Sequence, residues 1–161
     1  MDAVAEVRLD GPALEAWRSF LQSHASIVRA LDAELDAEHD LTTRDYEVLL
    51  YLAQADDRHL PMSALAERTM LTRSGITRLV DGLVGAGLIE RVACSNDARV
   101  SYAQLTETGH EKLRRAGCSH VASINRLFVE RFTADELAQL AELLGRLPGA
   151  RTDGACAVEP A

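Results

Sequence analysis

The sequence predicts a mainly α-helical fold that contains a single small β-hairpin. Along most of the 161 residues, apolar side chains recur at three- and four-residue spacing, which is typical of helices that bury one face. This spacing breaks between residues 88 and 105, where two β-prone runs flank a polar turn. The hairpin comes directly after two short helices that a tight turn joins, and longer helices precede and follow this central unit.

The first predicted helix runs from about Pro12 to about Glu38. Pro12 suits its first turn, where the missing proline N–H is not needed. A second helix follows Thr42, whose hydroxyl can cap it with Asp45 three positions later, and it ends near Asp56. The apolar stripe of the first helix consists of Leu14, Trp17, Leu21, His24, Ile27, Val28, Leu31 and Leu35.

Two short helices separated by a turn at Met70 and Leu71 form the next unit. Ser63 is predicted to cap the first of them and Thr72 the second, because both hydroxyls precede an apolar run. Gly85 supplies a flexible position for the end of the second helix. The predicted inward residues are Leu65, Ala66 and, as a further candidate, Met70 in the first helix, and Ile76, Leu79, Val80, Leu83 and Val84 in the second.

The hairpin and two further helices complete the predicted elements. Residues 88–92 and 100–105 are the β-prone strands, and residues 95–98 are typical of a turn. A helical pattern then extends from Thr106 to about Phe132. The S/T-x-x-E sequence at 133–136 is a capping box that opens a last helix. Its apolar residues are Leu137, Leu140, Leu143, Leu144 and Leu147.

Length and composition predict one compact domain at residues 12–147, between an N-terminal arm (1–11) and a disordered tail (148–161). A chain of this length with 47% hydrophobic residues can bury one core and is too short for two ordinary domains. Because it contains neither a run of 18 apolar residues nor a secretory signal, we expect a cytoplasmic protein without a membrane partner.

The charge is distributed unevenly along the chain. The net charge of -8 argues superficially against a polyanionic partner, but Pro61–Arg115 carries eight basic and six acidic residues. The remainder carries nine basic and nineteen acidic residues. The central segment is therefore where contact with DNA is expected.

The helix that starts at Thr72 has the outward composition of a DNA-reading helix. Arg73 and Arg78 can pair with guanine edges or neutralise phosphate, and Ser74 and Thr77 can contact phosphate oxygens or base edges. An ordinary solvent-exposed helix shows the same residue types, so the helix alone does not decide the function. The hairpin that follows it provides the second, independent signal.

The tip of the hairpin carries Asp97 and Arg99. An Arg held on such a wing can enter the minor groove, and a carboxylate two residues earlier can hold its side chain in position. Helix pair and wing together make a winged helix-turn-helix, and over about residues 12–147 the chain resembles the MarR (multiple antibiotic resistance regulator) family. The resemblance rests on the successive motifs MSALAERT (62–69), TRSGITRLVDGLV (72–84), GAGLIER (85–91), DAR (97–99) and LTETG (105–109).

The resemblance implies a homodimeric transcription regulator, most often a repressor, that binds double-stranded DNA at a pseudo-palindromic operator. Residues 41–105 would form the DNA-binding lobe, and helices 12–38 and 106–147 the dimerisation region. The two reading helices would then lie about one helical turn of DNA apart. The expected DNA-binding residues are Ser63, Thr72, Arg73, Ser74, Thr77, Arg78, Asp97 and Arg99.

Family members commonly respond to small aromatic or phenolic anions, and the resemblance implies such an effector here. Trp17 and His24 lie on one face of the first helix with Arg18 beside it. An aromatic wall, a titratable imidazole and a forked cation together suit an aromatic acid. Tyr46 is a candidate for the opposite wall. The alternative is that Trp17 is dimer core, Arg18 a surface ion-pair partner and His24 an interface histidine.

The sequence also allows other functions. Cys94 at the base of the wing could make the regulator respond to oxidation. A winged helix without DNA contact could act as a protein-protein adaptor, although the outward arginines argue against it. No catalytic or nucleotide-binding motif supports an enzyme. Three widely spaced cysteines without a C-x-x-C pair predict neither a disulfide framework nor a zinc site, and no cofactor is expected.

Overall fold

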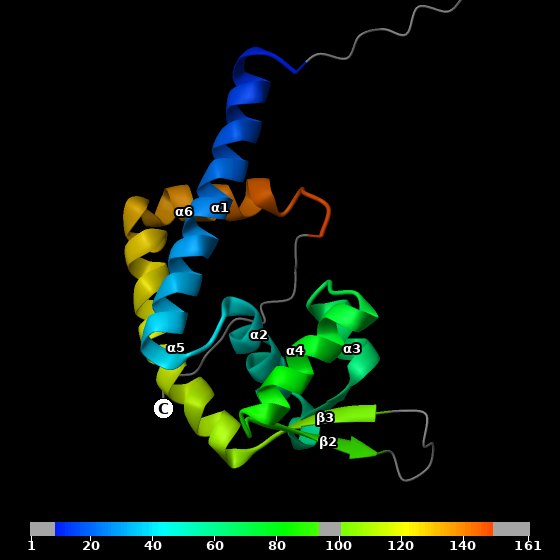
Figure 1. Ribbon diagram of the computed structural model, residues 1–161. Helices are drawn as coiled ribbons and strands as arrows, with labels where there is room; N and C mark the ends of the chain where they lie inside the picture. The colour runs from blue at the N-terminus through cyan, green and yellow to red at the C-terminus, as the bar shows by residue number, and fades with distance from the viewer. Residues whose placement is uncertain (1–8, 94–100, 150–161) are drawn as a thin grey trace, which may run out of the picture.

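The computed structural model describes residues 9–93 and 101–149 and contains the predicted helices and hairpin (Figure 1). Helices α1, α5 and α6 lie together, while α2, α3, α4 and the sheet gather beside the C-terminal end of α1. No helix in these two ranges is long and apolar enough to cross a membrane. The elements are α1 (Gly11–His39), α2 (Thr43–Ala53), β1 (His59–Pro61), α3 (Met62–Arg68), α4 (Arg73–Gly85), β2 (Ile89–Ala93), β3 (Ser101–Leu105), α5 (Glu107–Leu127) and α6 (Ala134–Leu144), with 3-10 turns at Asp56–Arg58 and Val129–Arg131.

Capping side chains fix several helix starts at the predicted positions. Thr42 Oγ1 accepts the Asp45 N–H at 3.1 Å, and the Asp45 carboxylate accepts the Thr42 N–H at 2.9 Å, which is a complete capping box. Thr133 and Glu136 repeat this arrangement at α6. The backbone and side-chain hydrogen bonds from Thr133 hold the pKa of Glu136 below its ordinary value. Both predicted capping boxes are confirmed.

The structure adds a third strand, β1, which is not among the predicted elements. Strand β1 pairs antiparallel with β3, with Leu60 opposite Ala103, so the order in the sheet is β1-β3-β2. Because β1 ends at Pro61 and α3 begins at the next residue, Pro61 takes the N-cap position. The prediction that Ser63 caps α3 is therefore wrong, and Ser63 lies exposed in the first turn. Met70 is also not a core residue: it is 83% exposed, with a left-handed φ of 53° in the turn after α3.

The hydrophobic core lies between the sheet, α2, α3, α4 and the adjoining parts of α1 and α5. The inward face of α4 is buried as predicted. In α1, by contrast, only Leu31 and Leu35 are buried, and α6 has no buried residue. The N-terminal half of α1 and the apolar face of α6 are therefore open to solvent in a single chain. The largest fully buried apolar side chains are Leu35, Leu41, Val48, Leu49, Leu52, Leu65, Ile76, Val80 and Ile89.

A tight joint connects the start of β2 with the start of α5. Thr106 donates its backbone N–H to the Leu88 carbonyl at 3.1 Å and its hydroxyl to the Gly87 carbonyl at 2.8 Å. The same hydroxyl accepts the Gly109 N–H at 3.0 Å and so caps α5. Gly109 is buried against Leu88, where a Cβ would lie 2.1 Å from the carbonyl oxygen. In the LTETG run, Thr106 thus caps α5, and Gly109 allows a close contact with Leu88 that a side chain would block.

Candidate nucleic-acid interface

Helix α4 presents an amphipathic surface that starts at a capped N-terminus. Thr72 Oγ1 accepts the Gly75 N–H at 3.1 Å, as predicted from its position before the helix. Ile76, Val80 and Leu83 are buried on the inner side. The opposite side is polar and exposed, and it begins at the end of the helix where the macrodipole favours an anion.

The predicted reading residues lie on this outer side of α4. Arg73, Ser74 and Arg78 are exposed, and Thr77 is partly buried with its hydroxyl donated to the Arg73 carbonyl at 2.8 Å. Within the described residues, neither Arg73 nor Arg78 forms an ion pair. Their guanidinium groups are therefore available for an external anion.

A hollow of about 340 Å³ lies between α3, α4 and the sheet, and it brings several of the predicted residues together. Ser63, Arg73 and Thr77 line it from the two helices. Arg91 and Ser101 line it from β2 and β3, and neither was among the predicted site residues. The available signal for Arg91 was its place in the GAGLIER run, next to the reading helix in the basic part of the chain.

The tip of the wing falls between the two described ranges. Three predicted residues lie outside the described residues: Arg99, expected in the minor groove, Asp97, expected to position it, and Cys94, the candidate redox thiol. Their predicted roles remain predictions. Cys118 on α5 is an exposed free thiol. The described part of the chain contains no group of three or more His, Cys, Asp or Glu residues placed to hold a metal ion.

Two of the predicted effector residues belong to a row of rings along α1. The centroid of the Phe20 ring lies 6.3 Å from that of Trp17 and 6.3 Å from that of His24. Trp17 is 53% exposed, and Phe20, which lies between the two predicted residues, was not among the effector candidates. Trp17 and Phe20 also line an apolar groove of about 640 Å³ between α1 and α6, together with Leu9, Ala13, Ala16, Leu143, Leu144 and Leu147.

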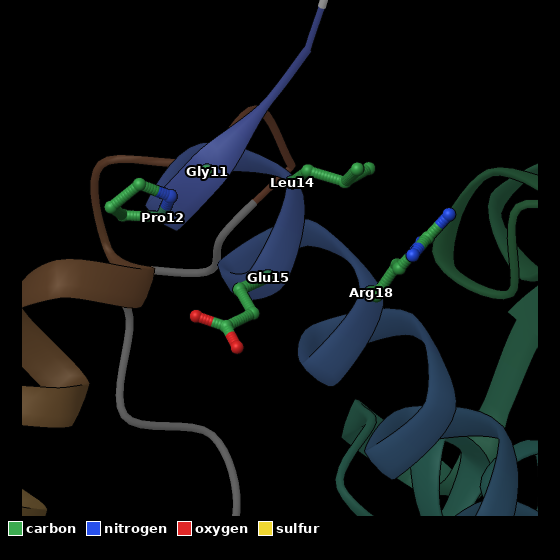
Figure 2. A pocket seen from close by; sticks show the side chains of 5 residues that line it. All are labelled: Gly11, Pro12, Leu14, Glu15 and Arg18. Atoms are coloured by element: carbon green, nitrogen blue, oxygen red, sulfur yellow. The ribbon is translucent and has the colours of Figure 1, made fainter.

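Arg18 lies in a different hollow from Trp17. It lines an open space of about 330 Å³ at the start of α1, with Gly11, Pro12, Leu14 and Glu15 (Figure 2). In this view the Arg18 side chain extends away from the Glu15 carboxylate. Arg18 forms no ion pair with any residue that the structure describes, so its charge is open to a ligand.

Tyr46, the fourth effector candidate, is a core residue of the single chain. Its side chain is buried, and its ring centroid lies 4.6 Å from that of His120 on α5. Burial lowers the pKa of His120, while the nearby Glu34 carboxylate on α1 opposes this shift. Glu34 accepts hydrogen bonds from Ser123 and Arg126, in that order the main causes of its lowered pKa. In the single chain Tyr46 thus packs where α2 meets α5. Its role as the opposite wall of the effector site stays a prediction.

Two regulators from Streptomyces coelicolor are among the solved structures similar to this chain. AbsC, a MarR family transcriptional regulator, has a TM-score of 0.81 at 31% sequence identity, and the match covers 86% of this chain and 93% of AbsC. Sco3205, a MarR family transcriptional regulator solved in complex with DNA, has a TM-score of 0.82 at 30% identity, covering 87% of this chain and 88% of Sco3205.

Characterised sequences show the same relationship. The HTH-type transcriptional repressor YetL of Bacillus subtilis (strain 168) is 29% identical over 111 residues, which are 69% of this chain and 66% of YetL. The homoprotocatechuate degradative operon repressor of Escherichia coli is 28% identical over 106 residues, 66% of this chain and 70% of that repressor. Residues 39–100 match the sequence profile of the MarR family. The chain therefore belongs to the MarR family of DNA-binding winged helix-turn-helix transcription regulators.

Proposed function

We propose that this regulator is a homodimeric repressor that reads a pseudo-palindromic operator with α4 and is released by a small aromatic or phenolic anion. The main support is the outer surface of α4, where Arg73 and Arg78 are exposed and form no ion pair within the described residues. The names of YetL and the homoprotocatechuate degradative operon repressor favour repression. The solution of Sco3205 in complex with DNA favours direct binding to a duplex.

In this proposal each side chain has a role that its position suits. Arg73 and Arg78 pair with guanine O6 and N7 or with phosphate. The hydroxyls of Ser63 and Ser74 donate to phosphate oxygens. The Thr77 hydroxyl is donated to the Arg73 carbonyl, so Thr77 contacts a base edge through its methyl group. Thr72 caps α4 and fixes the direction of its N-terminus toward the groove. Arg99 is assigned to the minor groove beside it, with Asp97 holding the Arg99 side chain in position.

Replacing both Arg73 and Arg78 with alanine is expected to weaken operator binding by about 100-fold, because each side chain contributes on the order of 1–3 kcal/mol. The salt dependence should also fall, by about 0.9 in the log-log slope for each phosphate that the variant no longer neutralises. Fluorescence anisotropy at several salt concentrations measures both. The duplex would be one that the unmodified protein selects from a random library.

A matched variant replaces Arg114 and Arg115, which are exposed on α5, with alanine. It removes the same charge from another surface, so it should retain affinity within a few-fold. Equal decreases in affinity in the two double variants would show that α4 does not read DNA. If the unmodified protein selected no duplex at all, the adaptor interpretation would replace the repressor.

The effector is proposed to bind on α1, with Arg18 as its cationic partner. An exposed guanidinium without an ion pair within the described residues can form a forked pair of hydrogen bonds with a carboxylate. The rings of Trp17, Phe20 and His24 offer an apolar wall on a neighbouring part of the same helix. The name of the homoprotocatechuate degradative operon repressor makes aromatic acids the first class to try.

Arg18→Ala is expected to raise the acid concentration needed for half-maximal release by about tenfold, which is the loss of one charge-assisted hydrogen-bond pair. Operator affinity without effector should change by no more than a few-fold. The measurement is anisotropy of the preformed complex titrated with benzoate, 4-hydroxybenzoate or homoprotocatechuate. Arg29→Ala, at another exposed arginine of α1, is the control. Release of the Arg18 variant at the concentration that releases the unmodified protein would exclude Arg18 as the anion partner.

A further inference from the structure

An ion pair joins the reading helix to the strand that leads into the wing. Arg91 Nη2 on β2 donates to Asp81 Oδ1 on α4 at 2.7 Å. Asp81 is the only acidic residue in the α4 sequence. It follows Arg73 and Thr77 at intervals of four residues, so these three side chains form one row along the helix. The pair therefore lies at the end of a row of predicted reading residues.

The charges of Asp81 and Arg91 offset each other, whereas those of Arg73 and Arg78 are not offset by any described residue. A lone carboxylate in the row that includes Arg73 would repel the phosphates of a bound duplex. The guanidinium of Arg91 lies against Asp81 and neutralises it, whereas Arg73 and Arg78 form no ion pair with any described residue. The side chains of Arg91 and Asp81 are 34% and 59% exposed, so solvent and DNA can reach both. Arg91 is thus held in an ion pair, whereas Arg73 and Arg78 remain available for DNA.

The pair also links two elements that, under the proposed function, approach different grooves of the duplex. Strand β2 is at the edge of the sheet and pairs with β3 alone. Arg91 lies two residues before Ala93, the last residue of β2. The contact with Asp81 therefore ties the base of the wing to the third turn of α4.

We propose that Asp81 and Arg91 are a positioning pair that orients the wing relative to α4 and thereby sets how well the regulator distinguishes its operator from other DNA. The inference rests on the proposed function, because it presupposes that α4 and the wing both contact the duplex. Specific binding needs the two elements in register with two grooves, whereas non-specific binding needs only positive charge. Removing the pair should therefore act on the ratio of the two affinities.

The test measures this specificity ratio for Asp81→Asn, Arg91→Gln and the double variant. Anisotropy gives the affinity for a duplex that the unmodified protein has selected and for a shuffled duplex of the same length. Each single variant should lower the ratio by about fivefold, and the double variant by no more than either one, because all three remove the same interaction. Non-specific affinity should rise in Asp81→Asn, fall in Arg91→Gln and stay unchanged in the double variant, following the net charge.

Two controls distinguish an effect on the position of the wing from a loss of folding and from a change in net charge. An exposed ion pair contributes little to stability, so the thermal melts of all three variants should stay close to that of the unmodified protein. Glu90→Gln removes a neighbouring exposed carboxylate on β2 and changes the net charge as Asp81→Asn does, but it should leave the ratio unchanged.

Several results would overturn the inference. Unchanged ratios in all three variants would mean that the pair has no part in recognition. A lower ratio in Arg91→Gln alone would make Arg91 a direct DNA contact, and additive decreases in the double variant would mean that the two residues act independently. In each of these cases the unmodified protein still binds its selected duplex, so the proposed function stands. Failure of the unmodified protein to select any duplex would overturn both.

Discussion

Replacing Gly109 with alanine is expected to lower the free energy of unfolding by about 3 kcal/mol or more. The added Cβ would lie 2.1 Å from the Leu88 oxygen and 2.8 Å from Leu105 Cδ1. The Leu88 oxygen cannot move away easily, because it accepts the Thr106 N–H. Helix α5 would therefore have to shift from the sheet, breaking the cap at Thr106. Thermal unfolding followed by circular dichroism should show a melting temperature lower by roughly 10 °C.

Gly82→Ala is the matched control, since it makes the same substitution where space is free. Gly82 is exposed on α4, and a Cβ there would meet nothing within 4 Å. Alanine favours a helix interior over glycine by up to about 1 kcal/mol, so this variant should melt at the same or a slightly higher temperature. Both should be measured at one protein concentration, because association makes melting temperatures depend on it. Equal melting of the two variants would mean that α5 tolerates a side chain at Gly109.

Signals that act within a few residues explain why the order and starts of the helices could be predicted. Thr42, Thr72 and Thr133 each cap a helix by accepting the backbone N–H three positions later. This interaction depends only on residues that are close in the sequence. The same holds for the LTETG run, in which Thr106 is a cap. The family resemblance added the order of these motifs, and the comparisons confirm the family.

Interactions between distant segments explain what could not be predicted. Strand β1 has only three residues, and its pairing with β3 depends on a partner more than 40 positions away. Because β1 ends at Pro61, α3 starts at Met62, earlier than predicted, and Ser63 therefore lies inside the helix and does not cap it. Tyr46 opens a helix and could have faced several neighbours, and its burial depends on His120 of α5. The pairing of Asp81 with Arg91 likewise depends on how β2 lies against α4.

In a single chain, the apolar faces of α1 and α6 are exposed to solvent, and substitutions on these faces are expected to have a large effect on assembly. The groove of about 640 Å³ between α1 and α6 is almost wholly apolar, with Phe20 40% and Leu143 53% exposed. An exposed apolar patch of this kind is typical of an interface. Under the proposed function a second copy covers it, with the two α4 helices then about one helical turn of DNA apart.

Phe20→Asp combined with Leu143→Asp should convert the proposed dimer to a monomer, because two carboxylates from each copy would be buried without partners in the interface. Sedimentation equilibrium measures the mass directly. Without the second half-site, operator binding should weaken by about 10²- to 10⁴-fold, the gain that linking two binding modules usually supplies. Ala138→Asp, exposed on the other side of α6, introduces the same residue and should leave mass and affinity unchanged. Since neither Phe20 nor Leu143 is buried in the single chain, the monomer should keep its helical circular dichroism. A double variant that sediments as a dimer would place the interface elsewhere.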